Sequence, residues 1–373
     1  MRSVFSLPHG KPYNPVIMGP IKLYVGEDYK EEKLFTYTEL LFPFWGVSAK
    51  ESMPYMRAAA LQYQYSKNDF ALVADINDCD YVLMPYSYER LMSVNPEKVA
   101  HILREAHEAG KPIIIDGAGD LEHPIEVPNS IVLRVSPYRF SIQENEIVLP
   151  FSAEDLLEAY RGGDFQIRKK KDVPSVGFTG WASLSPIRRI KLFVKELPIT
   201  LGALFDEKRG AEHKGLLFRE RSLKALSRTK GIRANFTARK TYSGHTATIH
   251  GTVKNNREEF IDNLAESDYA LAVRGDANSS VRFYEALSMG CIPLFLDTAC
   301  VLPLEDRLNY RNFCVFVDWR DTDRIGEKIV EFHRSVAPEQ FEEMQRKARE
   351  AYEKYLRIDS FSGHLADMLR KRL

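Results

Sequence analysis

The feature that most constrains the fold is a repeated alternation of short apolar runs with amphipathic segments. Residues 81–85 (YVLMP) and 111–116 (KPIIID) are apolar runs of strand length. Between them, residues 95–109 begin with a capping asparagine followed by proline and end before a glycine, which is typical of a helix. Strands separated by helices at this spacing predict a parallel, doubly wound sheet. Further strands are expected at residues 20–25, 131–135 and 146–149, and a further helix over residues 51–66.

The same alternation restarts in the second half of the chain. Residues 161–174 change composition, with Arg-Gly-Gly, a basic run and Asp-Val-Pro, and this segment is the expected domain boundary. The chain is therefore expected to form an α/β structure of two facing Rossmann-like domains, residues 1–165 and 172–340. Residues 341–373 should form C-terminal helices, the last of which returns to the first domain. Expected strands are 175–178, 269–273, 291–296 and 315–317, and expected helices are 186–197, 257–266, 279–289, 338–356 and 360–373.

Composition excludes several classes of protein. Of the 373 residues, 44% are hydrophobic and 28% are charged, as in ordinary globular domains. Lys plus Arg equals Asp plus Glu at 52 each, so no net charge favours nucleic acid. The four cysteines show no metal-binding spacing, and no apolar run approaches the roughly 18 residues that span a bilayer. We expect a cytoplasmic protein without a secretory signal, with the inner face of the membrane as an alternative location.

Residues 269–297 (YALAVRGDANSSVRFYEALSMGCIPLFLD) are the most informative segment for function. A buried strand is followed by a turn and a new helix, whose free amides and positive dipole end suit a phosphate. In open α/β sheets, ligands bind outside the carboxyl ends of the strands, where this turn lies. Ser279 and Ser280 add hydroxyl donors there, and Arg274 and Arg282 add guanidinium groups that match phosphate oxygens.

Spacing separates the two faces of the helix over residues 279–289. Apolar side chains three and four residues apart should pack on the sheet, whereas Arg282 and Glu285 share a neighbouring face. A carboxylate at position 285 can accept hydrogen bonds from both hydroxyls of a ribose. The alternative is a surface ion pair between Arg282 and Glu285, which would contribute little.

Residues 274–297 also resemble the signature of the exostosin family of glycosyltransferases: an arginine-glycine turn, Asn-Ser, Arg-Phe-Tyr-Glu-Ala-Leu and Gly-x-Ile-Pro. The resemblance implies the two-Rossmann GT-B fold, inversion at the anomeric carbon and a UDP-sugar donor. It also implies that Arg274, Asn278, Ser279, Ser280 and Arg282 bind the diphosphate and that Glu285 binds the ribose. We expect a protein without the membrane anchor and the second catalytic domain of the animal exostosins. It resembles shorter bacterial relatives that build surface polysaccharide.

A second tier of residues could contact the donor. Thr179 and Gly180 follow the expected strand at 175–178, although an ordinary turn explains them equally well. Arg188 lies near the start of the next helix and could contact a phosphate or simply face solvent. His245 lies in a glycine- and threonine-rich stretch suited to a loop over the cleft.

An inverting transferase needs a base that takes the proton from the acceptor hydroxyl. In this fold the acceptor lies on the first domain, so the base should follow one of its strands. Glu89 follows the strand at 81–85, and Asp116 and Asp120 follow the strand at 111–116, with Glu122 and His123 nearby. The sequence leaves the choice among them open.

Neither a cofactor nor an essential metal is expected. Asp78-Cys-Asp80 precedes its strand, at the wrong end of the sheet, and Asp321-Thr-Asp323 opens a helix, where aspartates serve as caps. The expected partners are a UDP-sugar donor and a glycan or lipid-linked glycan acceptor, with peripheral membrane association left open and nucleic acid excluded. A catalytically silent nucleotide-binding partner of an active transferase, or a sugar-nucleotide epimerase, is the alternative function.

Overall fold

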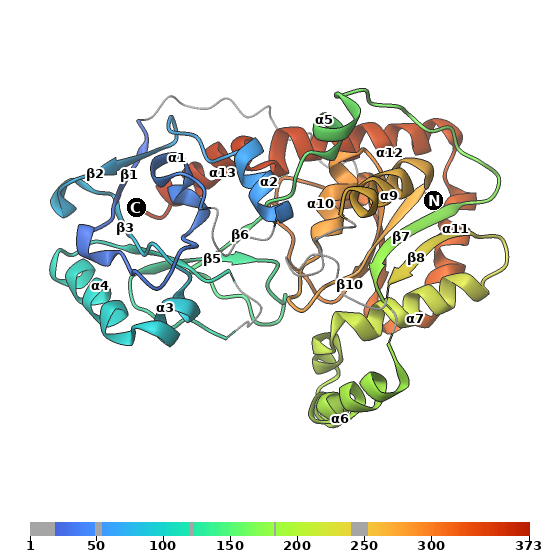
Figure 1. Cartoon of the computed structure of the whole chain (residues 1–373), viewed down its shortest axis with the longest axis horizontal. Helices are drawn as coiled ribbons and strands as arrows, with labels where there is room; N and C mark the ends of the chain where they lie inside the picture. The colour runs from blue at the N-terminus through green and yellow to red at the C-terminus, as the bar shows by residue number, and fades with distance from the viewer. Residues whose placement is uncertain (1–18, 49–53, 119–122, 183, 240–252) are drawn as a thin grey trace, which may run out of the picture.

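The computed structural model describes residues 19–48, 54–118, 123–182, 184–239 and 253–373. Two parallel sheets lie side by side, each with helices packed around it (Figure 1). The predicted fold class, an α/β structure of two Rossmann-like domains with parallel sheets, is therefore confirmed. Three of the candidate site residues, Asp120, Glu122 and His245, lie outside the described residues.

The first sheet has six parallel strands in the order β2-β1-β3-β4-β5-β6. Its central strands are short apolar runs that are buried on both faces, as expected when helices cover a parallel sheet. The strands are β1 (Ile21–Tyr24), β2 (Phe70–Val73), β3 (Tyr81–Leu83), β4 (Ile113–Asp116), β5 (Ser130–Val135) and β6 (Glu146–Leu149). The helices are α1 (Phe42–Trp45), α2 (Pro54–Gln62), α3 (Tyr88–Val94), α4 (Pro96–Glu108) and α5 (Leu156–Arg161).

The second sheet has five parallel strands in the order β11-β10-β9-β7-β8. β9 is fully buried, whereas β8 is a half-exposed strand at the edge of the sheet. The strands are β7 (Ser175–Trp181), β8 (Arg233–Arg239), β9 (Tyr269–Ala272), β10 (Ile292–Asp297) and β11 (Val315–Asp318). The helices are α6 (Pro186–Ala203), α7 (Gly215–Arg228), α9 (Val253–Glu266), α10 (Val281–Ser288), α11 (Ile325–Ser335), α12 (Pro338–Ala351) and α13 (Ile358–Arg370).

Both sheets contain a point at which the strand order reverses. In the first sheet it lies between β1 and β3, and in the second between β9 and β7. The loops that leave the carboxyl ends of strands on either side of such a point diverge, and ligands bind in the crevice between them. The loops after β7 and β9 are therefore the part of the second domain where a ligand is expected.

The C-terminal helices connect the two domains. α12 lies along the second domain and continues as a π-helical turn at Tyr352–Leu356. After the extended residue Arg357, the chain continues as α13 against the first sheet (Figure 1). The hydroxyl of Tyr81 in β3 donates to the carbonyl of Leu369 at 2.8 Å, and the amide of Ser66 donates to Ser362 Oγ at 2.9 Å. In the part of the chain that the structure describes, no helix combines the length and apolarity needed to cross a membrane.

A buried ion pair joins α12 to the end of the first domain. Arg349 donates to both carboxylate oxygens of Asp155, at 2.6 and 3.0 Å, and also to the carbonyl of Ser288 in α10. Asp155 is fully buried and caps α5, because its side chain accepts the amide hydrogen of Glu158. One guanidinium group thus connects the first domain, α10 and the crossing helix.

We predict that Arg349→Ala lowers the free energy of unfolding by about 3–5 kcal/mol, because it leaves the carboxylate of Asp155 buried without its main counter-charge. Urea unfolding measures this change. The control is Arg346→Ala on the same helix, whose ion pairs with Glu342 and Glu343 are exposed and should contribute less than about 1 kcal/mol. Equal losses for the two variants would contradict the assigned role of Arg349.

Candidate active site between the two sheets

Arg282 lies at the strand-order reversal of the second sheet. It is in the first turn of α10, and its Nε donates to the carbonyl of Thr179 in β7 at 3.2 Å. Its guanidinium group lies over the ring of Phe178, 4.8 Å from the ring centroid. Stacking on an aromatic face together with a backbone hydrogen bond holds a guanidinium group in one orientation.

Gly180 makes this position of Arg282 possible. Its φ of 147° lies in a region that residues with a side chain rarely adopt. A Cβ atom on Gly180 would lie 2.0 Å from Nη2 of Arg282. The glycine that the sequence indicated as a contact to the donor therefore provides the space in which the guanidinium group sits.

Buried hydroxyl and amide groups without protein partners surround this arginine. Thr179 Oγ1, Ser280 Oγ and Asn278 Nδ2 are buried, and none of them has a hydrogen-bond partner within the described ranges. Ser280 is the N-cap residue of α10, yet its side chain makes no capping hydrogen bond. Buried polar groups normally have partners, so these three groups mark a place where a polar ligand could supply them. Ser279 beside them is half-buried.

Arg274, a predicted diphosphate ligand, makes several hydrogen bonds within the protein. It is buried and donates four hydrogen bonds, to the carbonyls of Ala211, Asp276 and Ala277 and to the hydroxyl of Tyr138 in the first domain. Arg274 thus holds the turn after β9 and connects it to the first domain. Asn278 supports the same turn, because its Oδ1 accepts the hydroxyl hydrogen of Thr298 at 2.6 Å.

Glu285 is part of a buried charged triad. Arg257 in α9 donates to Glu285 at 2.7 Å and to Glu154 of the first domain at 2.7 Å. The two carboxylates keep the pKa of Arg257 raised, although its burial opposes this. The alternative considered from the sequence, an ion pair between Arg282 and Glu285, is not among the ion pairs of the described residues. The partner of Glu285 is Arg257, which lies on another helix.

The first domain contributes two half-buried carboxyl groups. Asp116 ends β4, and Glu39 lies in the short helix Glu39–Leu41. Burial raises the pKa of Asp116 to about 6, against hydrogen bonds from the Ala118 amide and Thr38. Burial and the charge of Asp116 raise the pKa of Glu39 to about 7, against a hydrogen bond from Ser152. A carboxyl group with a pKa near neutrality suits general acid–base chemistry.

Glu39 was missed by the sequence interpretation because it follows no strand signal. Its position depends on a tertiary contact, in which the amide of Thr38 donates to the carbonyl of Pro85 just beyond β3 at 2.8 Å. This contact brings Glu39 to the carboxyl edge of the first sheet, near Asp116. No local sequence pattern marks Glu39 as a residue of this edge.

The remaining candidate residues of the sequence analysis lie in different surroundings. Glu89 is half-buried in the first turn of α3. Arg188 is exposed in the first turn of α6. His123 is exposed, and its carbonyl accepts a hydrogen bond from Arg134 at 2.5 Å.

The two Asp-x-Asp triplets have structural partners. Asp80 accepts the amide hydrogen of Lys22 at 2.7 Å, Asp321 pairs with Lys328 and Asp323 pairs with Arg221. One other group in the described part of the chain has metal-ligand spacing: Asp28, His101 and Glu105, with ligand atoms within 4.8 Å of one another. It includes an exposed aspartate and two residues of α4, at the far end of the first domain from the second (Figure 1).

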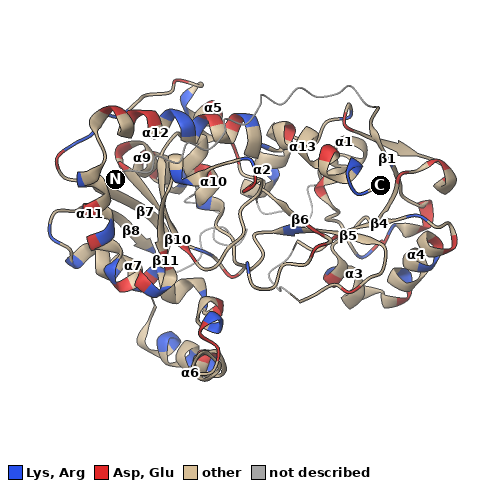
Figure 2. Cartoon of the chain, turned by 180° about the vertical axis from the view of Figure 1, so that it is seen from behind, with Lys and Arg blue, Asp and Glu red and all other residues tan. Residues whose placement is uncertain are grey.

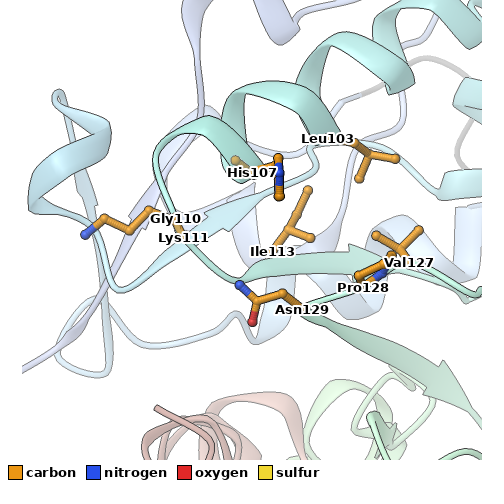
Figure 3. Close-up of a pocket in the computed structure, with 9 residues that line it drawn as sticks. Leu103, His107, Gly110, Lys111, Ile113, Val127, Pro128 and Asn129 are labelled. Atoms are coloured by element: carbon orange, nitrogen blue, oxygen red, sulfur yellow. The ribbon is translucent and has the colours of Figure 1, made fainter.

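A small cavity in the first domain lies at the wrong end of the sheet. Its volume is about 80 Å³, and it is bounded by the end of α4 and by residues just before β4 and β5 (Figure 3). His107 and Asn129 are on its wall, at the amino edge of the strands. A ligand of an α/β sheet binds at the opposite, carboxyl edge. This cavity is therefore separate from the candidate site.

We predict that Glu39→Gln changes how stability depends on pH. A carboxyl group whose pKa is raised by folding favours the folded state at low pH, and this contribution is lost as pH rises to about 7. The glutamine variant lacks this loss, so its stability relative to the wild type should rise by about 3 kcal/mol between about pH 4 and pH 8.

Urea unfolding at a series of pH values measures the difference. Glu32→Gln, at an exposed position of the same segment, is the control and should run parallel to the wild type. A Glu39→Gln profile that also runs parallel to the wild type would contradict a raised pKa for Glu39.

Comparison with known proteins places a family domain over this part of the chain. Residues 203–331 match the model of the Exostosin GT47 domain. Over 119 residues the chain is 30% identical to an Exostosin-1 homolog of Caenorhabditis elegans, covering 32% of this chain and 30% of the relative. It is 28% identical over 119 residues to Exostosin-1 of Drosophila melanogaster, covering 32% and 15%. It is 27% identical over 123 residues to the probable arabinosyltransferase ARAD1 of Arabidopsis thaliana, covering 33% and 27%. The matches span less than a third of each relative's length.

Solved structures show a more distant likeness. A glycosyltransferase from Rickettsia africae is similar with a TM-score of 0.35 and 11% identity, covering 79% of this chain and 77% of that chain. TarM is similar with a TM-score of 0.32 and 11% identity, covering 73% and 58%. The resemblance predicted from the sequence is confirmed by the family match and the exostosin relatives: residues 203–331, which contain Arg282 and Glu285, match the Exostosin GT47 domain, and about a third of the chain is similar to exostosins.

Proposed function

We propose that this protein is an inverting glycosyltransferase that moves a sugar from a UDP-sugar to a glycan acceptor in surface polysaccharide synthesis. The observation that supports this most is the position of Arg282 at the strand-order reversal of the GT47 domain. It is held there by the ring of Phe178 and the carbonyl of Thr179, beside buried hydroxyl groups that lack partners in the described structure.

On the donor side, the site would stabilise the leaving diphosphate. Negative charge develops on the phosphate oxygens as the bond to the anomeric carbon breaks, and fixed donors aimed at those oxygens lower the barrier. Arg282, the first amides of α10 and the hydroxyl groups of Thr179, Ser279 and Ser280 are such donors. Glu285 remains the proposed partner of the ribose hydroxyls, with Arg257 holding its carboxylate in place.

On the acceptor side, Asp116 and Glu39 are the proposed bases. The acceptor oxygen forms a bond to the anomeric carbon while the bond from that carbon to the diphosphate breaks, which inverts the configuration. The proton of the acceptor hydroxyl passes to an ionised carboxylate, and a pKa of about 6 leaves most Asp116 carboxyl groups ionised at neutral pH. Glu39, with its pKa near 7, would be partly protonated there. Asp116 is therefore the better candidate for the base.

We predict that Arg282→Ala reduces turnover about a hundredfold or more, because one charge-assisted donor to the leaving group is lost. The measurement is release of UDP from a panel of UDP-sugars, with and without candidate glycan acceptors. A silent partner protein would release none, and an epimerase would convert the donor without an acceptor. Either result would contradict the proposal.

Two control variants separate the role of the charge from that of the fold. Arg346→Ala removes an exposed arginine from α12 and should leave turnover unchanged. Gly180→Ala keeps Arg282 but places a methyl group where its guanidinium group lies, so it should also reduce turnover and weaken nucleotide binding. Wild-type turnover in Arg282→Ala, with the fold intact by circular dichroism, would show that another group binds the diphosphate.

We also propose that transfer needs no metal ion, because Arg282 and the amino end of α10 supply positive charge to the diphosphate. Turnover should therefore persist in excess EDTA. Complete loss that manganese restores would contradict this. Asp28→Asn would then test the group of Asp28, His101 and Glu105, and Asp321→Asn would serve as its control.

A further inference from the structure

The most unusual surface of the described structure is one side of α6. This helix projects from the body of the second domain (Figure 1). Large apolar side chains on it face solvent: Ile187 is 69% exposed and Phe193 is 62% exposed. Just beyond the helix, Phe205 is 93% exposed. Soluble surfaces rarely concentrate apolar side chains in this way, and such a patch normally indicates a binding surface.

The exposed apolar residues share one side of the helix. At about 100° per residue they fall within roughly a third of its circumference. The opposite side packs on the domain: Glu196 is buried and accepts hydrogen bonds from His213 and from the amide of Lys214, both at 2.9 Å. We call the following residues the apolar side of α6: Ile187, Ile190, Phe193, Val194, Leu201 and Leu204.

Positive charges flank the apolar side. Arg188, Lys191 and Lys195 are exposed and spaced three and four residues apart, so they form one row along the helix. Arg189, on the other flank, pairs with Glu220 of α7. The only acidic residue within the helix is the buried Glu196. Figure 2 shows the ribbon of α6 as largely tan and blue.

The apolar side of α6 and the basic residues beside it indicate which kind of partner binds there. An apolar side bordered by lysine and arginine is the pattern of a helix that lies in the plane of a membrane surface, with its apolar side among the acyl chains and its basic residues near anionic headgroups. A second copy of this chain fits less well, because a symmetric pairing through the apolar side would bring two basic rows together. We propose that α6 binds the protein to an anionic lipid surface.

The position of α6 links this surface to the candidate active site. The helix begins a few residues after β7, the strand that supplies Phe178, Thr179 and Gly180. A membrane bound at α6 would therefore lie near the carboxyl edge of the second sheet. A lipid-linked glycan acceptor would be held at this membrane surface, and this step rests on the proposed function. The binding of lipid by α6 does not rest on it.

The test is co-sedimentation of the whole chain with vesicles, in the absence of donor and acceptor. The wild type should bind vesicles of equimolar phosphatidylcholine and phosphatidylglycerol, bind phosphatidylcholine alone at least tenfold more weakly, and lose binding as salt is raised. Two double variants should each weaken binding about tenfold or more. One combines Phe193→Ser with Leu204→Ser, and the other combines Lys191→Glu with Lys195→Glu.

Matched controls use exposed residues elsewhere on the protein. One control is Leu61→Ser on α2, and the other combines Lys224→Glu in α7 with Lys230→Glu just after it. Both should bind vesicles as the wild type does. All variants change exposed residues, so their thermal unfolding should be unaltered. The inference would be overturned if the wild type did not bind anionic vesicles or if both α6 variants bound normally. It would also be overturned if light scattering showed a dimer that the apolar variant abolishes. Because vesicle binding is scored without turnover, its failure is distinct from failure of UDP release.

Discussion

The placement of one sheet against the other depends on a charge that is fully removed from water. The carboxylate of Asp155 is bound by Arg349, whose guanidinium group also holds the carbonyl of Ser288 at the end of α10. Removing two charges from water costs several kcal/mol each, so such a pair adds little net stability but penalises every arrangement that separates its members. The triad of Glu154, Arg257 and Glu285 acts at the same boundary. These contacts fix the position of the first sheet relative to the second.

Much of the architecture could be predicted because the buried strands of a parallel sheet are apolar throughout. The central runs YVL, IIID and YALA are recognisable without any knowledge of their neighbours. The strands that were missed, β2 and β8, lie at sheet edges. β8 has the sequence RANFTAR and is half-exposed, so partnership with β7 rather than its own hydrophobicity makes it a strand.

The candidate site was less predictable, because side chains of the right type can have partners that spacing does not reveal. Arg274 and Glu285 were expected to bind the nucleotide, yet each already bonds to a group on a distant segment: Arg274 to Tyr138, and Glu285 to Arg257. Arg282 was expected near the start of its helix, where the structure has it, but its orientation comes from Phe178 and Gly180 on another strand. Glu39 depends wholly on a tertiary contact, so no local pattern could identify it.

The return of α13 to the first sheet also bears on how the chain folds. One contiguous apolar core contains Ile21 and Leu23 of β1 together with Phe361, Leu365 and Leu369 of α13. During synthesis, β1 is therefore made long before α13, the helix that completes its packing. Contacts between such distant parts of a chain form slowly, and the uncovered side of the sheet is exposed to aggregation in the meantime. The first domain is thus synthesised first but completes its core packing last.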